Sequence, residues 1–336
     1  MGNEVSVSIP LIRSGAILPV RRWLREHGRN EDLLLRKTGL EWVPRDDPAL
    51  PISLHCAVRI LSELAKTDGP DIPYRIVGDL GAFEIGLIGA VGLQGPTVGE
   101  GLRRMADTMR SHCTHEMFTV TTQNRAVGVM DGWSLVLGDD ETLHYVQQYD
   151  IAIIDMICST ATGVRPNVSD VKMMPHPVYG LTHLRSWLGD RVSPADSRAL
   201  TFTVGSDIAS LSFPEPVTRA ALAGFLAHSG ALSPGAPLAD DIATFLKPML
   251  SRTKVSLEKV AAGAGMSTRT LRRRLKEEGT GFSDILERTR REIALRRLQQ
   301  DNPPTMKALA KELGYANQAT LTRARQRWRG QTPHSA

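Results

Sequence analysis

The chain of 336 residues carries 41 Lys and Arg against 36 Asp and Glu, a formal net charge of +5, and 41% hydrophobic residues. At about 100–200 residues per domain, this length predicts two domains, and the composition excludes a disordered or fibrous chain. Three Cys residues, odd in number and far apart, argue against a disulfide scaffold and for a reducing compartment. Because neither a signal peptide nor a membrane-spanning apolar run is recognisable, we expect a soluble cytoplasmic protein with no membrane partner.

The charge is divided unevenly along the chain. Residues 240–336 hold 20 Lys and Arg against 10 Asp and Glu, whereas residues 1–239 hold 21 against 26. A boundary is marked by Ser229–Pro237, SGALSPGAP, where Ser, Gly and Pro cluster. We therefore predict domains at 1–228 and 240–336, joined by a linker at 229–239. The basic domain is typical of nucleic-acid binders, because neutralising phosphates releases counterions. A solvated charged surface is the alternative.

The first domain mixes helix and strand patterns. Apolar periodicity predicts helices at Arg13–His27, at Pro51–Lys66, after a cap at Thr97, and at Glu141–Thr162. Alternating patterns predict strands at Glu116–Thr122, Arg125–Met130, Trp133–Leu137, Ala199–Val204 and Ala209–Phe213, with turns at Gln123-Asn124 and Asp131-Gly132. These elements indicate a mixed α/β domain, of the α+β or α/β class, that buries a sizeable core.

After the linker every pattern is helical. Ser256 caps a short helix, Gly263-Ala264-Gly265 forms a turn, and Ser267 caps a second helix, which is a helix-turn-helix pattern. A similar unit at Thr305–Arg329 follows 49 residues later, with Asn317 capping its second helix. The segment between them has one apolar face, formed by Phe282, Ile285, Leu286, Thr289 and Ile293. We expect an all-α domain with two helix-turn-helix units joined by a long helix.

The second helix of each unit has one basic or polar side and one apolar side. The outward residues of the first are Arg269, Arg272, Arg273 and Lys276, opposite Leu271 and Leu275. Those of the second include Gln318, Thr320, Arg323 and Arg327, opposite Leu321, Ala324 and Trp328. Such helices fit the major groove of double-stranded DNA, where Arg contacts guanine and neighbouring cations meet phosphates. A charge run is more often only a solvated face, but the caps, the glycine turn and the repeat favour DNA binding.

Two stretches carry a family resemblance. GMSTRTLRRRLKEEGTGFSDILERTRREIALRRL and LAKELGYANQATLTRARQRWRGQTP resemble the AraC/XylS transcription regulators, over about Asp241–Pro333. The resemblance implies two helix-turn-helix units, and RNA polymerase as a further partner. It places base-reading positions on Arg269, Arg272 and Arg273, and on Gln318, Thr320 and Arg323. Leu321 stands in place of the family's commoner Phe, a mild change, whereas Arg325 stands where the family usually buries a second Phe. We expect the Arg325 stem to extend over the core with its head in solvent, and the second unit to pack more loosely or to bind DNA less specifically.

The first domain more weakly resembles the arabinose-binding type of ligand domain found in one AraC subgroup. The stretches are PISLHCAVRILSEL, GLIGAVGLQGPTVGEGLRRMADTMRSH and LRSWLGDRV. The resemblance implies a small-molecule effector and a homodimer, without implying arabinose. Ligand pockets are mostly apolar with few polar groups, which makes candidates of Trp133, Tyr149, Met156 and Trp187. Core positions are the alternative for all four.

No motif for catalysis, a metal or a cofactor is recognisable. The sequence lacks a nucleophile elbow, a zinc-binding helix motif and a phosphate loop. The cluster His112, Cys113, His115 and Glu116 is interpreted as polar contacts at a helix end rather than as metal ligands. We predict a DNA-binding transcription regulator controlled by an effector. Two alternatives are an enzyme-like first domain tethered to nucleic acid and an architectural DNA-binding protein without an effector.

Overall fold

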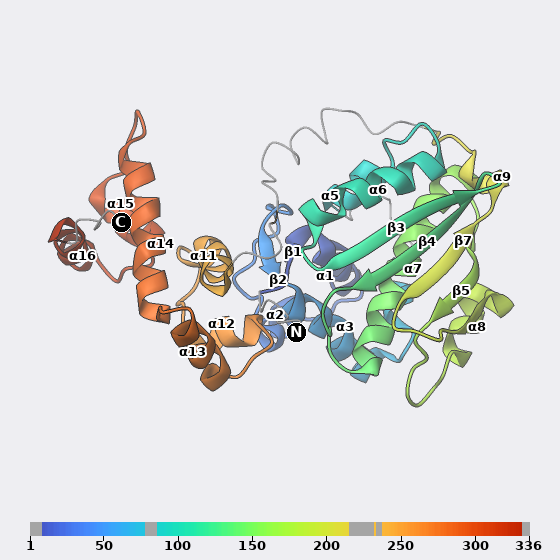
Figure 1. Ribbon diagram of the computed structural model, residues 1–336, viewed down its shortest axis with the longest axis horizontal. Coiled ribbons are helices and arrows are strands. Elements are labelled where there is room, and N and C mark those ends of the chain that lie inside the picture. Colours follow the sequence, from blue (N-terminus) through green and yellow to red (C-terminus); the bar gives the residue numbers. More distant parts are fainter. Residues whose placement is uncertain (1–8, 78–85, 215–231, 233–236, 331–336) are drawn as a thin grey trace. The chain divides into compact units, whose positions relative to one another are not determined.

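The computed structural model describes residues 9–77, 86–214, 232 and 237–330 (Figure 1). The chain divides into two compact units, one within residues 10–234 and the other within residues 235–336 together with Ile9. Most of the predicted linker at 229–239 lies outside the described residues, and a helix already begins at Leu238. Within the described ranges, no helix is both long and apolar enough to cross a membrane. Cys56, Cys113 and Cys158 are free and buried.

The first unit contains helices and two sheets. Its helices are η1 (Ser14–Ile17), α1 (Leu18–Glu26), α2 (Glu31–Thr38), α3 (Leu54–Asp68), α4 (Ile72–Val77), α5 (Gly86–Gly92), α6 (Val98–His112), α7 (Asp140–Thr162), η3 (Thr182–Leu184), α8 (Arg185–Leu188), η4 (Gly189–Arg191) and α9 (Ser206–Ala209). Its strands are β1 (Leu11–Arg13), β2 (Pro51–Ser53), β3 (Glu116–Gln123), β4 (Ala126–Trp133), β5 (Ser169–Met173), β6 (Val192–Pro194) and β7 (Leu200–Val204). This is the mixed helix-and-strand domain expected from the sequence.

The larger sheet has the strand order β3-β4-β7-β5-β6, and β5 and β6 run parallel while the other described pairs are antiparallel. One face is apolar and buried, with Phe118, Val129 and Phe202 on neighbouring strands. Helix α6 packs against β3, and α7 passes behind the sheet in Figure 1. On the other face Met117 and Met130 are about half exposed. The sheet therefore has one covered side, the geometry of an alternating strand pattern.

Two predicted helices begin later than expected. Leu11–Arg13 pairs with Pro51–Ser53 in a small antiparallel sheet, so the first residues of the predicted helices Arg13–His27 and Pro51–Lys66 are extended. Helix α3 then starts after Ser53, whose Oγ accepts a hydrogen bond from the Cys56 amide at 3.1 Å. The prediction failed because apolar periodicity reports local repeats and cannot detect pairing between distant segments.

The predicted meander over residues 116–137 is a two-stranded hairpin. The chain turns at Asn124 and Arg125, with φ of 50° and 66°, the positive pair that a tight hairpin turn requires. Asp131-Gly132, predicted as a turn, continues β4 and pairs with Phe118 and Met117. The predicted strand Trp133–Leu137 was wrong, because β4 ends at Trp133.

For the remaining elements of the first unit, some predictions are confirmed and others are wrong or absent. Thr97 caps α6, and the long helix predicted at Glu141–Thr162 is α7. The strand predicted at Ala199–Val204 is β7. The strand predicted at Ala209–Phe213 was wrong, because Ala209 ends the short helix α9. Strands β5 and β6 were not predicted.

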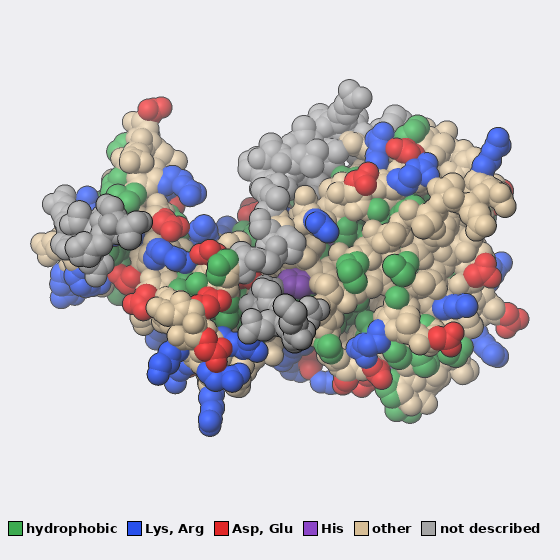
Figure 2. Space-filling view, in the orientation of Figure 1, with side chains coloured by type: hydrophobic (Ala, Val, Ile, Leu, Met, Phe, Trp, Pro, Cys, Tyr) green, Lys and Arg blue, Asp and Glu red, His purple; other side chains and the backbone are tan. Residues whose placement is uncertain are grey.

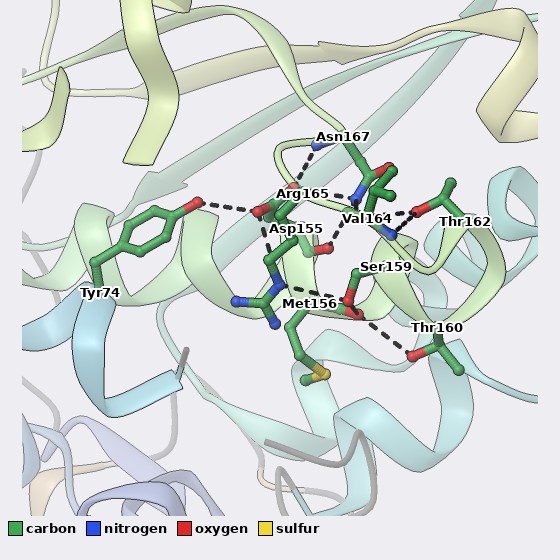
Figure 3. A network of polar contacts seen from close by, with 9 residues as sticks. All are labelled: Tyr74, Asp155, Met156, Ser159, Thr160, Thr162, Val164, Arg165 and Asn167. Atoms are coloured by element: carbon green, nitrogen blue, oxygen red, sulfur yellow. Dashed lines mark hydrogen bonds and ion pairs between the residues drawn. The ribbon is translucent and has the colours of Figure 1, made fainter. Parts of the chain in front are cut away.

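Asp155 fixes the second half of α7 to its neighbours (Figure 3). The Tyr74 hydroxyl donates to Asp155 Oδ2 at 3.0 Å, and the Asn167 amide donates to Oδ1 at 2.5 Å. Arg165 Nε lies 4.0 Å from Oδ2. Burial raises the pKa of Asp155, and these donors oppose that effect. The carboxyl group thereby joins α4, α7 and the segment that leads into β5.

The second unit is entirely helical where it is described. Its helices are α11 (Leu238–Met249), α12 (Leu257–Gly263), α13 (Thr268–Glu277), α14 (Phe282–Leu298), α15 (Met306–Glu312) and α16 (Gln318–Gly330). Helices α12 and α13 form one helix-turn-helix and α15 and α16 form the other, with α14 between them (Figure 1). The predicted caps Ser256, Ser267, Thr305 and Asn317 all accept a hydrogen bond from the backbone amide three residues ahead.

The start of α11 is tied to the end of α13. Glu278 accepts hydrogen bonds from the backbone amides of Leu238 and Ala239, at 2.9 and 3.0 Å. These amides belong to the first turn of α11 and have no partner within the helix. Arg288 of α14 adds an ion pair to Asp240 at 2.9 Å. Helix α11 is therefore anchored to both α13 and α14.

The turn of the second helix-turn-helix requires glycine for two reasons. Gly314 has a φ of 68°, and a Cβ there would lie 2.5 Å from the carbonyl oxygen of Leu250. Gly279 has a φ of 72° but open space around it. We expect Gly314→Ala to lower the free energy of unfolding by about 2–4 kcal/mol and Gly279→Ala by about 1–2 kcal/mol. Thermal unfolding followed by circular dichroism measures both, and equal losses would contradict the close approach.

Candidate nucleic-acid interface and ligand cavity

Helix α13 carries the first group of predicted DNA contacts. Leu271 and Leu275 are buried, at 0% and 1% exposure, and set the rotation of the helix. The opposite side exposes the predicted residues Arg269, Arg272, Arg273 and Lys276. Figure 2 shows Lys and Arg side chains gathered at this part of the helical unit. Arg273 lies 3.8 Å from Glu277, while the other three form no ion pair with a described acidic side chain.

Helix α16 carries the second group. Its inward side chains are Leu321, Ala324 and Trp328. They pack in one core with Leu309, Ala310 and Leu313. Among the predicted contacts, Gln318, Arg323 and Arg327 are exposed and Thr320 is half-buried. Arg323 donates to the Thr320 hydroxyl at 3.5 Å. The structure thus places all four on the accessible side of the helix, as it does for α13.

The head of Arg325 is less exposed than expected. The side chain is half-buried, and its Nη1 lies 3.3 Å from the Met306 sulfur. The guanidinium therefore lies along the margin of the core, with its stem over apolar surface. Leu321 and Trp328 are 0% and 9% exposed, so the core of this unit is closed without a Phe at either position.

Glu287 of α14 collects donors from three directions. Its Oε1 accepts from the Tyr315 hydroxyl at 3.1 Å and from Arg290 at 3.2 Å. Its Oε2 accepts from Trp328 Nε1 at 3.3 Å and from Arg327 at 3.4 Å. Two of these donors belong to α16, so one carboxylate positions the second predicted DNA-contacting helix against α14.

Arg290 fixes the turn that precedes α16. Its guanidinium donates to the carbonyl oxygens of Leu313 and Gly314, at 3.0 and 3.4 Å, and lies 4.3 Å from the centre of the Tyr315 ring. These carbonyls end α15 and would otherwise lack donors. The ring contact adds a cation–π attraction. The second helix-turn-helix is thus held to α14 by charged side chains as well as by its apolar core.

The candidate ligand residues are distributed among three places. Trp133 and Tyr149 line a cavity of about 80 Å³, called here the apolar cavity, beneath the larger sheet. Trp187 lines a separate cavity of about 430 Å³, together with Tyr74 and Asp155. Met156 is 1% exposed and lies in the core, lining neither cavity.

The apolar cavity has a small polar end. Glu116 and Asp150 line it, as does His112, which is 5% exposed and has no hydrogen-bond partner for its Nδ1 among the described residues. Burial, together with the charge of Arg13, lowers the pKa of His112 to about 4, so the ring is neutral at pH 7. The sequence cluster that contains His112 and Glu116 therefore faces a cavity, and no described group of three or more His, Cys, Asp or Glu is arranged to hold a metal.

Sequence reasoning missed two acidic residues near this end, Asp131 and Asp150. The sequence places Asp131 in a predicted turn and Asp150 in a predicted helix that is largely apolar. The available signal was the carboxylate at an inward position of each element, since Asp131 alternates in phase with the buried Val129. An inward carboxylate without a basic neighbour in sequence is unusual and deserves a functional explanation.

Comparison with known proteins gives consistent matches for both units. The family model described as the arabinose-binding domain of AraC transcription regulators, N-terminal, matches residues 28–203, and one described as a helix-turn-helix domain matches residues 260–336. The HTH-type transcriptional regulator VirS, from two strains of Mycobacterium tuberculosis, is 25% identical over 299 residues, which cover 84% of this chain and 83% of VirS. The crystal structure of transcriptional regulator CdpR from Pseudomonas aeruginosa aligns over 93% of this chain and 94% of that chain, at 16% identity and a TM-score of 0.40.

Replacing Glu287 tests its role in holding α16. We expect Glu287→Gln to weaken the hydrogen bonds from the two arginines and to destabilise α16 by about 1–2 kcal/mol. Hydrogen exchange should then show faster exchange in α16 with unchanged protection in α13. Glu292→Gln on the same helix is the control, since Glu292 is exposed and forms no described ion pair. Uniform loss of protection in both helices would contradict this local role.

Proposed function

Because this chain belongs to the AraC family of transcription regulators, with a helix-turn-helix DNA-binding domain and an N-terminal ligand-binding domain of the arabinose-binding type, we propose that α13 and α16 are its two DNA-recognition helices. The observation that carries this proposal is their shared geometry. Each follows a capped turn, buries one apolar side and exposes a polar or basic side. Helix α14 between them is about 25 Å long at 1.5 Å per residue, a length of the order of the 34 Å DNA repeat.

The exposed side chains suit different parts of the DNA. We assign base-edge contacts to Arg269, Arg272 and Arg273 in one major groove, because Arg donates two hydrogen bonds to guanine. In the next major groove, Gln318, Thr320 and Arg323 lie in the first two turns of α16, where recognition helices reach bases. Lys276 and Arg327 lie further along their helices and are assigned to phosphates.

The first domain supplies control. We assign effector binding and dimerisation to residues 1–228, joined through a linker at 229–239 to the DNA-binding domain at 240–336. An effector changes transcription only if it binds one arrangement of the protein more tightly than another. The family further suggests RNA polymerase as a partner on DNA and the cytoplasm as the place of action. VirS is a transcription regulator, and the function proposed for this chain includes no catalytic step.

DNA binding is testable with the intact protein. Selection from a random duplex pool should yield a preferred site, and its affinity should fall steeply with salt because phosphate contacts release counterions. Arg273→Ala should weaken binding to that site by about 1–3 kcal/mol. Arg25→Ala removes one exposed positive charge from the first unit and should leave affinity nearly unchanged. Failure to select any site, or salt-insensitive binding, would overturn the proposal.

Dimerisation has a candidate surface in the first unit. Strand β3 is an edge of the larger sheet, and Met117 and Met130 are 50% and 46% exposed on its uncovered face. Exposed edges and apolar side chains favour association. We expect Met117→Glu to shift sedimentation from dimer to monomer, whereas Thr121→Glu, on the same exposed face but further along β3, should shift it less. A purely monomeric parent protein would refute this proposal.

A further inference from the structure

The apolar cavity has walls that suit a hydrocarbon body. Most of its lining is apolar, with aliphatic and Met side chains from α1, α3, α6 and α7 and Phe118 from β3. A sugar needs a hydrogen-bonding partner for each hydroxyl group, and a wall of this kind leaves such groups unpaired. The hydrogen-bonding groups of the cavity are concentrated where Glu116, Asp150, His112 and Trp133 line it. The cavity therefore suits an amphipathic ligand, with an apolar body and one polar end.

Two carboxyl groups, Glu116 and Asp150, line that end, and a third, Asp131, lies beside them. Glu116 pairs with Trp133, and Phe118 pairs with Asp131, so Glu116 and Asp131 are diagonal neighbours on the inner face of the sheet. Asp150 comes from α7 and lies close enough to Asp131 and Glu116 for their charges to raise its pKa. Burial raises the pKa of all three carboxyl groups, and the charges of neighbouring acidic groups raise those of Glu116 and Asp150 further.

No cation of the described chain neutralises this group. None of the three carboxyl groups forms an ion pair with a described residue, and Asp131 is 1% exposed with no hydrogen-bond partner for either oxygen among the described residues. The nearby Arg13 is directed elsewhere, because its guanidinium donates to the carbonyl oxygens of Ser111 and Ala49. Buried charges in folded proteins are normally paired. The positive partner is missing from the described residues.

A second observation points to a ligand. His112 lines the cavity, and its Nδ1 is buried without a hydrogen-bond partner among the described residues; in the neutral ring that carries its proton on Nε2, this atom accepts a hydrogen bond from an ammonium group. Unpaired buried polar atoms cost free energy, so they are uncommon in native proteins unless something binds them. The unpaired atom and the carboxyl groups occupy the same end of one cavity.

We propose that this cavity binds a small organic cation, a primary amine or similar ammonium compound with an apolar body, whose charged nitrogen lies between Glu116 and Asp150. The inference rests on the proposed function in assigning an effector to the first domain, and it adds the chemical class. A fatty acid would place its carboxylate against three acidic groups, which is unfavourable in a poorly solvated site. An ammonium group instead donates charge-assisted hydrogen bonds to these carboxylates.

Binding should depend on pH with a definite sign. A cation competes with the protons held by carboxyl groups of raised pKa, so the amine should bind more tightly as pH rises, with release of protons to the buffer. The titratable or charged groups around the site are Glu116, Asp131, Asp150, His112, Cys113, Tyr149 and Arg13. His112 stays neutral over this range, and burial raises the pKa of Cys113 and Tyr149, so the carboxyl groups dominate the change.

The test is calorimetry on the full chain with matched probes. We expect n-butylamine, n-hexylamine or phenethylamine to bind, and n-hexanol, hexanoate and arabinose to bind at least about tenfold more weakly. Measurements at about pH 6 and about pH 8 should show tighter amine binding at the higher pH. Stronger binding of hexanoate or arabinose, or no binding of any amine, overturns the inference.

Two variants separate binding from folding. Asp150→Asn should weaken amine binding at least about tenfold while raising the thermal midpoint of the free protein, because it removes like-charge repulsion. A merely structural Asp150 would lower the midpoint instead. Asp107→Asn, at an exposed position on α6, should leave amine binding and midpoint unchanged. Equal binding by the parent protein and Asp150→Asn would overturn the inference.

The same samples distinguish this inference from the proposed function. Binding of the selected DNA duplex is measured with and without n-hexylamine. If DNA binds but no amine does, the inference fails and the proposed DNA-binding function stands. If the amine binds as expected but no DNA site is selected, the inference about the cavity stands and the proposed function fails.

Discussion

The DNA-facing surface depends on how apolar side chains fix the rotation of two short helices. In α13 the buried Leu271 and Leu275 leave only one side of the helix free, and that side is basic. In α16 Leu321 and Ala324 have the same effect. Rotating either helix would bury guanidinium groups without partners and expose leucine, at a cost of several kcal/mol. Apolar burial on the inner side therefore decides which charges are offered to DNA.

Charged side chains of α14 also hold the second helix-turn-helix in place, in addition to its small apolar core. Glu287 and Arg290 lie one turn apart on α14, and together they contact the end of α15, the ring of Tyr315 and the far part of α16. Such half-buried networks fix how the helices are oriented, but they add little to the free energy of unfolding, because desolvation of the charges offsets much of their attraction. A stiff α14 connected in this way sets the spacing of the two helix-turn-helix units.

In the first unit, by contrast, some buried charged groups have no partner of opposite charge among the described residues. Glu116, Asp131 and Asp150 bring acidic groups together without a described cation, which disfavours the unliganded state. Asp155 on the same helix shows the satisfied alternative, with donors from Tyr74 and Asn167. Folded proteins break the rules of polar pairing chiefly at functional sites. A ligand that relieves this repulsion would also stabilise the conformation that binds it.

The sequence by itself determined the helical unit. Ser256, Ser267, Thr305 and Asn317 were identifiable as caps because a cap bonds to an amide three residues away, and the inward leucines follow from a local period of 3.6 residues. The β1–β2 pairing, the extension of β4 through Asp131-Gly132 and the order of the larger sheet came only from the tertiary structure, since they join distant segments. The acidic end of the cavity was likewise decided only by the tertiary structure. The sequence singles out Glu116 only as a neighbour of two His and a Cys, and it does not single out Asp131 or Asp150. The three become a site only where two strands and a helix bring them together.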